Sequence, residues 1–166
     1  MRTHTLGARA FIIPFALAGA VLFSLAPSAP VAASTTTEAQ QIIRIAKAQL
    51  GDPWRYGTAG PSTFDCSGLV RYAFRRAGDA AAIHTGFLRS ARSLYTWFRA
   101  HGKTSRTNPH VGDLVIWGYG SHVGIYIGNG KAISTLTSGV RIHYVHAVRA
   151  RFTAYLRTGM SSTPAS

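Results

Sequence analysis

The spacing of apolar residues changes half-way along this chain of 166 residues, and this change limits the folds open to it. Up to about residue 101 the apolar positions recur every three or four residues, which is typical of helices. From residue 113 onward they alternate or form short runs, which is typical of strands. Helices followed by an antiparallel meander indicate an α+β domain, in which N-terminal helices pack on an antiparallel β-sheet.

Individual elements follow from the same pattern. Thr35 and Glu38 have capping-box spacing, so we expect a helix from about 36 to 50, with Leu50 on its apolar stripe. A second helix should start at Cys66 and end at Gly78, and a third should cover 87–100 with its arginines in solvent. The predicted strands cover 113–117, 122–127, 132–135, 140–145 and 152–156.

The N-terminal 33 residues have the organisation of a secretory signal peptide. Arg2 and Arg9 precede an almost wholly apolar run over 11–26, and Val31-Ala32-Ala33 places small residues at a cleavage site. The rival interpretation is a retained membrane anchor, but the run is shorter than the roughly 20 residues that span a bilayer. We therefore expect a signal peptide over 1–33, a secreted domain over 34–166, and membrane contact only during export.

Cys66 is the only cysteine of the chain, and it lies where a glycine-rich loop enters a helix. Unpaired N–H groups and the helix dipole favour an anion there, so we expect the pKa of the thiol to lie below its ordinary value. The alternative is a small buried hydrophobe, the usual fate of a free cysteine. In a secreted protein an unpaired cysteine instead indicates a reactive thiol.

A thiol nucleophile needs a base, and His122 is the strongest candidate. It starts a predicted strand directly after a glycine turn, where its imidazole can face a cleft. The other candidates are His84, His101, His110, His143 and His146. With no HExxH and no zinc spacing, the sequence predicts no metal and no other cofactor.

Four segments together resemble the NlpC/P60 family of cell-wall cysteine peptidases, which have a papain-like fold. They are Gly51–Gly57, Phe64–Val70, Val111–Val115 and Ser121–Gly130. The resemblance runs from about residue 42 to 156, and the DCSGL and HVGIYIG blocks are specific in combination. Within the family, the chain is similar to the short secreted members from actinobacteria.

This resemblance implies a hydrolase of peptidoglycan stem peptides that cuts between D-glutamate and meso-diaminopimelate or lysine. It implies that Cys66 is the nucleophile and His122 the base. It also implies that Asp65 and Ser67 contact the stem peptide, including its free amino end. Asp65 has an alternative role as the N-cap of the helix.

Two positions depart from the family pattern. Trp54 stands where the family usually has a tyrosine of the oxyanion site, and Tyr56 follows two residues later. Ser134 stands twelve residues after His122, where the family most often has a histidine that orients the base. Thr135 and His143 are the alternatives to Ser134.

The hairpin register decides whether Ser134 can reach His122. A plain two-residue Asn129-Gly130 turn would direct Ser134 away from the histidine's face. A bulged loop that includes Gly128 shifts the register by one residue, so that Gly124 faces Ser134 and both side chains share a face. The family pattern requires the bulged register.

Two other functions remain open from the sequence. One is a different thiol acyl-transfer enzyme on the same fold, an amidase or acyltransferase; the other is a non-catalytic wall-binding protein. No cluster of Lys and Arg interleaved with aromatic residues stands out, so nucleic acid is not an expected partner. The expected partners are stem peptides and anionic wall polymers, and we expect a monomer.

Charge gives a first prediction. Loss of Arg2 and Arg9 with the signal peptide takes the formal charge from +13 to +11. The processed protein should bind walls that carry anionic polymers and should be released as salt rises, because exposed charges are screened within about 8 Å at physiological ionic strength. Sedimentation with purified walls across a salt series measures this; binding that ignores salt would contradict it.

Overall fold

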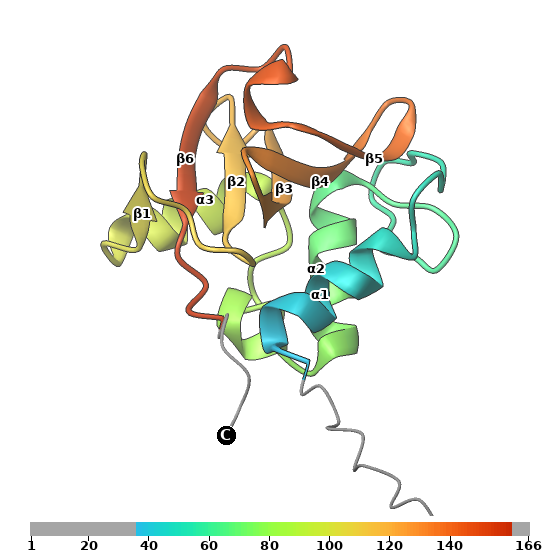
Figure 1. The fold of residues 1–166 in the computed structure, drawn as a ribbon, viewed down its shortest axis with the longest axis horizontal. Coiled ribbons are helices and arrows are strands. Elements are labelled where there is room, and N and C mark those ends of the chain that lie inside the picture. Colours follow the sequence, from blue (N-terminus) through green and yellow to red (C-terminus); the bar gives the residue numbers. More distant parts are fainter. Residues whose placement is uncertain (1–35, 161–166) are drawn as a thin grey trace, which may run out of the picture. The chain divides into compact units, whose positions relative to one another are not determined.

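The computed structural model describes residues 36–160, so the predicted signal peptide and residues 161–166 lie outside the described chain (Figure 1). The helices are α1 (Glu38–Lys47), α2 (Cys66–Ala77) and α3 (Ala91–Ala100), with short 3₁₀ turns η1 (Ala80–Ile83) and η2 (Val145–Ala147). The strands are β1 (Thr104–Ser105), β2 (Leu114–Trp117), β3 (His122–Gly128), β4 (Lys131–Leu136), β5 (Gly139–Tyr144) and β6 (Phe152–Leu156).

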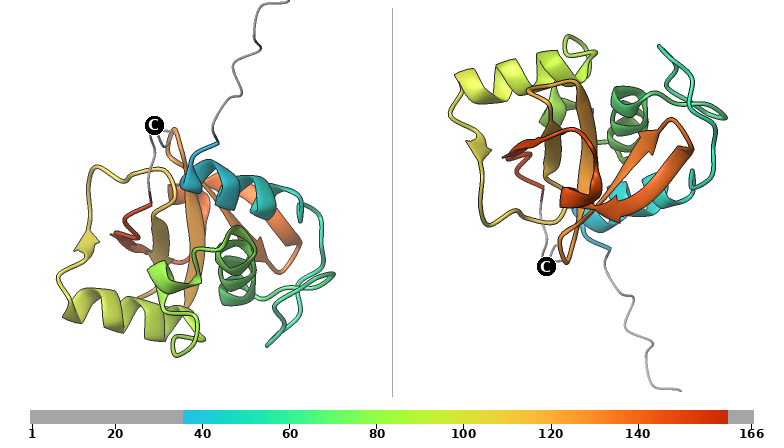
Figure 2. Two further views of the ribbon diagram at one scale, coloured as in Figure 1. Left: turned by 90° about the horizontal axis from the view of Figure 1, so that it is seen from below. Right: turned by 90° about the horizontal axis from the view of Figure 1, so that it is seen from above.

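The six strands form one sheet in the order β1-β6-β2-β3-β4-β5, and all neighbours are antiparallel. The predicted meander is therefore confirmed from β2 to β5, and β6 returns to pair with the other side of β2. The three helices lie on one face of the sheet, and the connection from β5 to β6 crosses the opposite face (Figure 2). The predicted α+β architecture is confirmed.

Two apolar clusters hold these layers together. The larger one joins the buried faces of the helices to one face of the sheet through Ile42, Phe74, Phe98 and Ile125. The smaller one lies on the other face, around Trp117 and Tyr155. Burying a large apolar side chain stabilises the fold by about 1.5–3 kcal/mol. Packing on both faces of the sheet therefore stabilises the strand order on which the candidate site depends.

The N-cap of the first helix lies two residues after the predicted one. Thr37, not Thr35, is the N-cap, and it forms the capping box with Gln40 instead of Glu38. The apolar stripe predicted the helix face, but it could not choose among three successive threonines. Leu50 lies beyond the helix end and is 45% exposed, so its predicted place on the buried stripe is wrong.

The third helix also starts later than predicted, at Ala91 rather than 87. Ser90 caps it and forms a reciprocal box with Ser93. Arg89 therefore precedes the helix instead of belonging to its solvent face. The two-residue strand β1 was not predicted, because an element this short has no period to detect.

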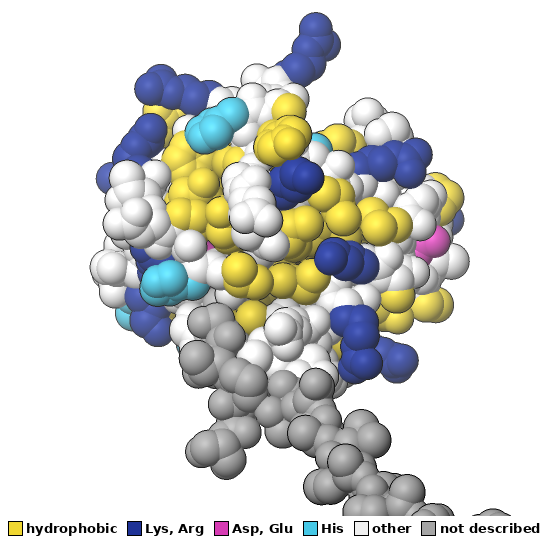
Figure 3. Space-filling view, in the orientation of Figure 1, with side chains coloured by type: hydrophobic (Ala, Val, Ile, Leu, Met, Phe, Trp, Pro, Cys, Tyr) yellow, Lys and Arg dark blue, Asp and Glu magenta, His cyan; other side chains and the backbone are white. Residues whose placement is uncertain are grey.

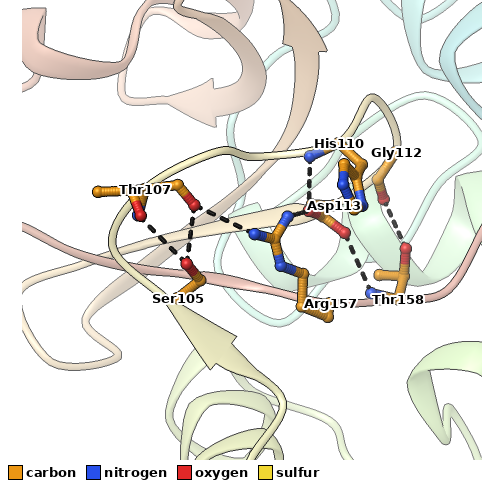
Figure 4. Close-up of polar contacts among 7 residues, drawn as sticks. All are labelled: Ser105, Thr107, His110, Gly112, Asp113, Arg157 and Thr158. Carbon is orange, nitrogen blue, oxygen red and sulfur yellow. Dashed lines mark hydrogen bonds and ion pairs between the residues drawn. The ribbon is translucent and has the colours of Figure 1, made fainter.

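Asp113 ties the start of β2 to the end of β6. Its carboxylate accepts hydrogen bonds from the His110 and Thr158 N–H groups, at 2.8 and 3.2 Å, and forms an ion pair with Arg157 at 2.7 Å (Figure 4). The Asp113 side chain is only 3% exposed. A buried carboxylate with this many donors stabilises the fold chiefly because each donor would otherwise lose its partner.

Replacing Asp113 by Ala should lower the free energy of unfolding by about 3 kcal/mol, because it removes the ion-pair partner of Arg157 and leaves the buried Thr158 N–H unpaired. Urea denaturation measures the change. Asp79→Ala is the matched control, since the Asp79 side chain makes no capping hydrogen bond. Equal losses in the two variants would contradict the role assigned to Asp113.

Within residues 36–160, no helix combines the length and the apolar character that crossing a membrane requires.

Candidate active site

Cys66 is the first residue of α2, and the residues around it explain why the helix starts there. Asp65 is the N-cap: its Oδ1 accepts from the Gly68 N–H at 2.6 Å, and its Oδ2 accepts from the Gly57 N–H at 2.9 Å. A side chain at position 68 would overlap the Thr58 carbonyl oxygen, so only glycine lets the upstream loop lie against the helix. The capping role predicted as an alternative for Asp65 is confirmed.

Ser67 sits beside this cap and is 6% exposed. Its hydroxyl lies 2.9 Å from Asp65 Oδ1 and 3.1 Å from the Arg89 carbonyl oxygen, and its one proton is shared between them. The hydroxyl therefore links the start of α2 to the segment before α3. Ser67 also lines a cavity.

The loop before α2 folds back on Phe64. Arg55 donates its N–H to the Phe64 carbonyl at 3.0 Å, and Phe64 donates its N–H to the Pro53 carbonyl at 3.1 Å. This arrangement holds Trp54 and Tyr56 at the rim of the site, where they are 44% and 85% exposed.

His122 starts β3, as predicted, and pairs with Trp117 across β2. The N–H of Val123, the next residue, is placed to hydrogen-bond to the Cys66 sulfur. Cys66 and His122 both line a cavity of about 490 Å³, together with Trp54, Tyr56, Asp65 and Ser67. The structure thus brings the predicted nucleophile, base and substrate-binding residues to one cleft.

Ser134 is the residue that contacts His122. The histidine Nε2 lies 2.9 Å from Ser134 Oγ, and Ser134 is fully buried. Ile125 pairs with Ile133, which places Gly124 opposite Ser134, and a bulge between Tyr126 and Gly128 sets this register. The predicted register, with Gly124 opposite Ser134, is confirmed. The predicted loop that includes Gly128 is wrong, because Gly128 pairs with Lys131 and the extra residue of the bulge is Ile127.

The two alternatives to Ser134 differ in their hydrogen bonds. His143, on β5, lies on the far side of Ser134, with its Nε2 2.8 Å from Ser134 Oγ. Thr135 hydrogen-bonds to neither histidine, since its buried Oγ1 has no hydrogen-bond partner within the described residues. Ser134 therefore lies between His122 and His143 and contacts both, so the two candidates belong to one chain of hydrogen bonds.

Burial dominates the electrostatics of the Cys66–His122 pair. It raises the pKa of the Cys66 thiol, and this outweighs the N–H groups of Val123, Ser67 and Cys66, which lower it; the Asp65 carboxylate raises it further. Burial, aided by His143, lowers the pKa of His122 to about 4. The predicted lowering of the thiol pKa is therefore wrong, because loss of solvation exceeds the effect of the helix start. Both shifts favour the neutral form of each group at neutral pH.

Two arginines that sequence analysis did not assign to the site also line the cleft. They are Arg71, five residues after Cys66 on α2, and Arg89, whose predicted place on a solvent-facing helix surface is wrong. The Nε of Arg71 is buried without a hydrogen-bond partner in the described chain. Arg71 lies four residues after Ser67, so helical spacing could have found it, but nothing local to Arg89 reveals its place.

A second cavity, of about 500 Å³, lies on the other side of His122. Trp54 and His122 line both cavities, and the second one has mainly apolar walls that include Leu136, Ala147 and Val148. Within residues 36–160, no three His, Cys, Asp or Glu side chains come together as a metal site would require.

A family model described as the NlpC/P60 family matches residues 51–157, which include every residue of this cleft. The chain belongs to the NlpC/P60 family.

The chain is 40% identical over 104 residues to a probable endopeptidase p60 of Listeria grayi, covering 61% of this chain and 19% of that protein. It is 36% identical over 107 residues to a probable endopeptidase of Mycobacterium bovis, covering 63% of this chain and 25% of that protein. The chain thus spans a quarter or less of the length of these curated relatives.

Solved structures agree with the fold. The peptidoglycan hydrolase RipB of Mycobacterium tuberculosis matches with a TM-score of 0.58 and 28% identity, over 73% of this chain and 64% of that chain. RipD of the same organism, described as a non-catalytic NlpC/p60 domain protein adapted to peptidoglycan binding, matches with a TM-score of 0.58 and 23% identity, over 72% of this chain and 95% of that chain. A shared fold therefore does not establish catalysis, and the side chains of the cleft carry that argument.

The raised pKa of the thiol has a direct consequence for its reactivity. Alkylation of Cys66 by iodoacetamide should be slow at pH 6–7 and should speed up as the pH rises past the ordinary thiol value of about 8.5, because only the thiolate reacts. Mass spectrometry of timed samples measures the rate, with free cysteine as the reference thiol. A rate that already levels off near pH 6 would show that the resting thiol is ionised.

Proposed function

We propose that the protein is a secreted peptidoglycan hydrolase that cuts stem peptides at the D-glutamyl–diaminopimelate type of bond through a cysteine mechanism. The observation that carries the proposal is the placement of Cys66 and His122 on one cleft, with His122 Nε2 held by Ser134 at 2.9 Å. Membership of a family whose relatives are named endopeptidases supports the peptidase class.

In the proposed reaction, His122 Nδ1 takes the thiol proton as the Cys66 sulfur attacks the scissile carbonyl carbon. Because both groups are neutral at rest, proton transfer accompanies the attack. N–H groups at the start of α2 stabilise the oxyanion. The tetrahedral intermediate then expels the amine, which takes the proton back from His122, and water hydrolyses the thioester with His122 again as the base.

The charges of the cleft fit a peptide that carries both an ammonium group and carboxylates. Asp65 Oδ2 accepts one hydrogen bond within the described chain, from Gly57, which leaves a lone pair for a free amino end. Arg71 and Arg89 line the same cleft and offer guanidinium groups to carboxylates. A stem peptide released from its glycan has these charges, with a free amino end and the carboxylate of D-glutamate.

The overall charge suits a protein that works in an anionic wall. The sequence carries 18 Lys and Arg against 5 Asp and Glu. Lys and Arg side chains spread around the face shown in Figure 3, where acidic side chains are scarce. Together with the signal peptide predicted over 1–33, this supports export and association with anionic wall polymers.

Digestion of purified peptidoglycan tests the proposed function. The protein should release fragments that mass spectrometry identifies as cut between D-glutamate and the diamino acid, and Cys66→Ala should release none, because the sulfur forms the acyl-enzyme. Cys66→Ala should still sediment with peptidoglycan, which shows that it remains folded and binds.

Three other outcomes would contradict the proposed function. Fragments cut at a different amide bond would favour the amidase or acyltransferase alternative. Sedimentation without any fragments from the wild type would favour a wall-binding protein. Equal digestion by Cys66→Ala would overturn the thiol mechanism.

A further inference from the structure

Three hydrogen bonds link His122 to the surface of β5 in an unbroken chain. His122 Nε2 lies 2.9 Å from Ser134 Oγ, and Ser134 Oγ lies 2.8 Å from His143 Nε2. His143 Nδ1 then lies 3.1 Å from the Tyr144 carbonyl oxygen. The chain crosses β3, β4 and β5, so it depends on the sheet rather than on a loop.

The last member of the chain sets its direction. A carbonyl oxygen only accepts, so His143 Nδ1 must carry a proton and donate it to Tyr144. In neutral His143 the Nε2 is then an acceptor, and Ser134 donates its hydroxyl proton to it. Ser134 Oγ is left to accept from His122, so His122 carries its proton on Nε2 and keeps a free lone pair on Nδ1.

The side chains of this hydrogen-bond chain have few alternative partners. Ser134 is fully buried, so its hydroxyl has only the two imidazoles as partners among the described residues. The indole of Trp117 packs against both, with ring centroids 5.2 Å from His122 and 5.6 Å from His143. Trp117 is itself fixed, because its Nε1 donates to the Val145 carbonyl at 2.7 Å.

We propose that His143 is a positioning residue that acts through Ser134 to hold His122 in its reactive tautomer, and that protonation of His143 reverses the chain and removes the base. This inference rests on the function proposed above. Protonated His143 would donate from Nε2 to Ser134, whose hydroxyl would then donate to His122 Nε2. The His122 proton would move to Nδ1, the nitrogen that must accept from the thiol.

Among residues 36–160, the ring nitrogens of His143 hydrogen-bond to Ser134 and to the Tyr144 carbonyl, and to no carboxylate. The titratable and charged side chains near His143, on β3, on β4, on its own strand and along the second cavity, are His122, Lys131, Arg141, Tyr144 and Arg149. None of them is a carboxylate. Ser134 is therefore the group that responds when His143 gains a proton.

Nitrogen-15 NMR of histidine-labelled protein tests the proposal without relying on activity. At neutral pH, long-range proton–nitrogen correlations should show His122 protonated on Nε2 and His143 on Nδ1. As the pH falls, His122 should switch to the Nδ1-protonated form at the pH where His143 becomes charged. In His143→Gln the amide oxygen can still accept from Ser134 but cannot titrate, so this switch should vanish.

Kinetics on peptidoglycan fragments supplies the functional readout. His143→Ala should lower kcat about two- to tenfold with KM unchanged, because a neutral hydrogen bond of this kind is worth a factor of that order. His143→Gln should restore kcat and keep activity at a lower pH than the wild type. His146→Ala is the matched control, since His146 is exposed and contacts Phe152 rather than the chain.

Two results would overturn the proposal. One is His122 protonated on Nδ1, or in a mixture of tautomers, in the wild type at neutral pH. The other is a tautomer and pH response in His143→Gln that equal those of the wild type. Because the NMR measurement needs no turnover, a protein that cleaves nothing would contradict the proposed function and leave this test standing.

Discussion

The register of β3 against β4 is the constraint on which the candidate site depends. Side chains alternate between the faces of a sheet, so a slip by one residue would turn Ser134 away from His122. The bulge between Tyr126 and Gly128 prevents that slip. Gly124 lets β3 and β4 lie this close at the site, because a side chain at position 124 would meet the Ile133 carbonyl at 2.9 Å and the Ser134 Cβ at 3.0 Å. The hairpin thus determines which polar residue supports the base.

Burial decides the resting state of the cleft. A helix start and a nearby imidazole favour a thiolate, yet the pKa of Cys66 is raised and that of His122 is lowered to about 4. Loss of water penalises each charged form, so the two groups rest as a neutral pair. The donors that lower the thiol pKa remain in place, and a substrate carbonyl would bring the developing negative charge to them. Burial also makes the His122 tautomer important, because a neutral imidazole is a base at only one nitrogen.

Family membership and chemistry are separate conclusions here. The NlpC/P60 model covers 51–157, and a protein described as non-catalytic shares the fold with a TM-score of 0.58. The chemistry of a cleft on this scaffold therefore depends on a few side chains. In this chain those side chains include the thiol of Cys66, the imidazole of His122 and two arginines, a set suited to a charged peptide.

Turn chemistry left two registers open for the hairpin, and the resemblance to the family selected the bulged one. The sequence by itself determined the order of helices and strands, and the place of Cys66 at a helix start and of His122 at a strand start. Each of these follows from local spacing or turn chemistry, which neighbouring residues carry. Only the tertiary structure decided which threonine caps α1, where β1 pairs, that Arg89 lines the cleft, and that burial raises the thiol pKa. It alone placed His143 behind Ser134. These features depend on contacts and on lost solvation between segments far apart in the chain, and no local pattern records either.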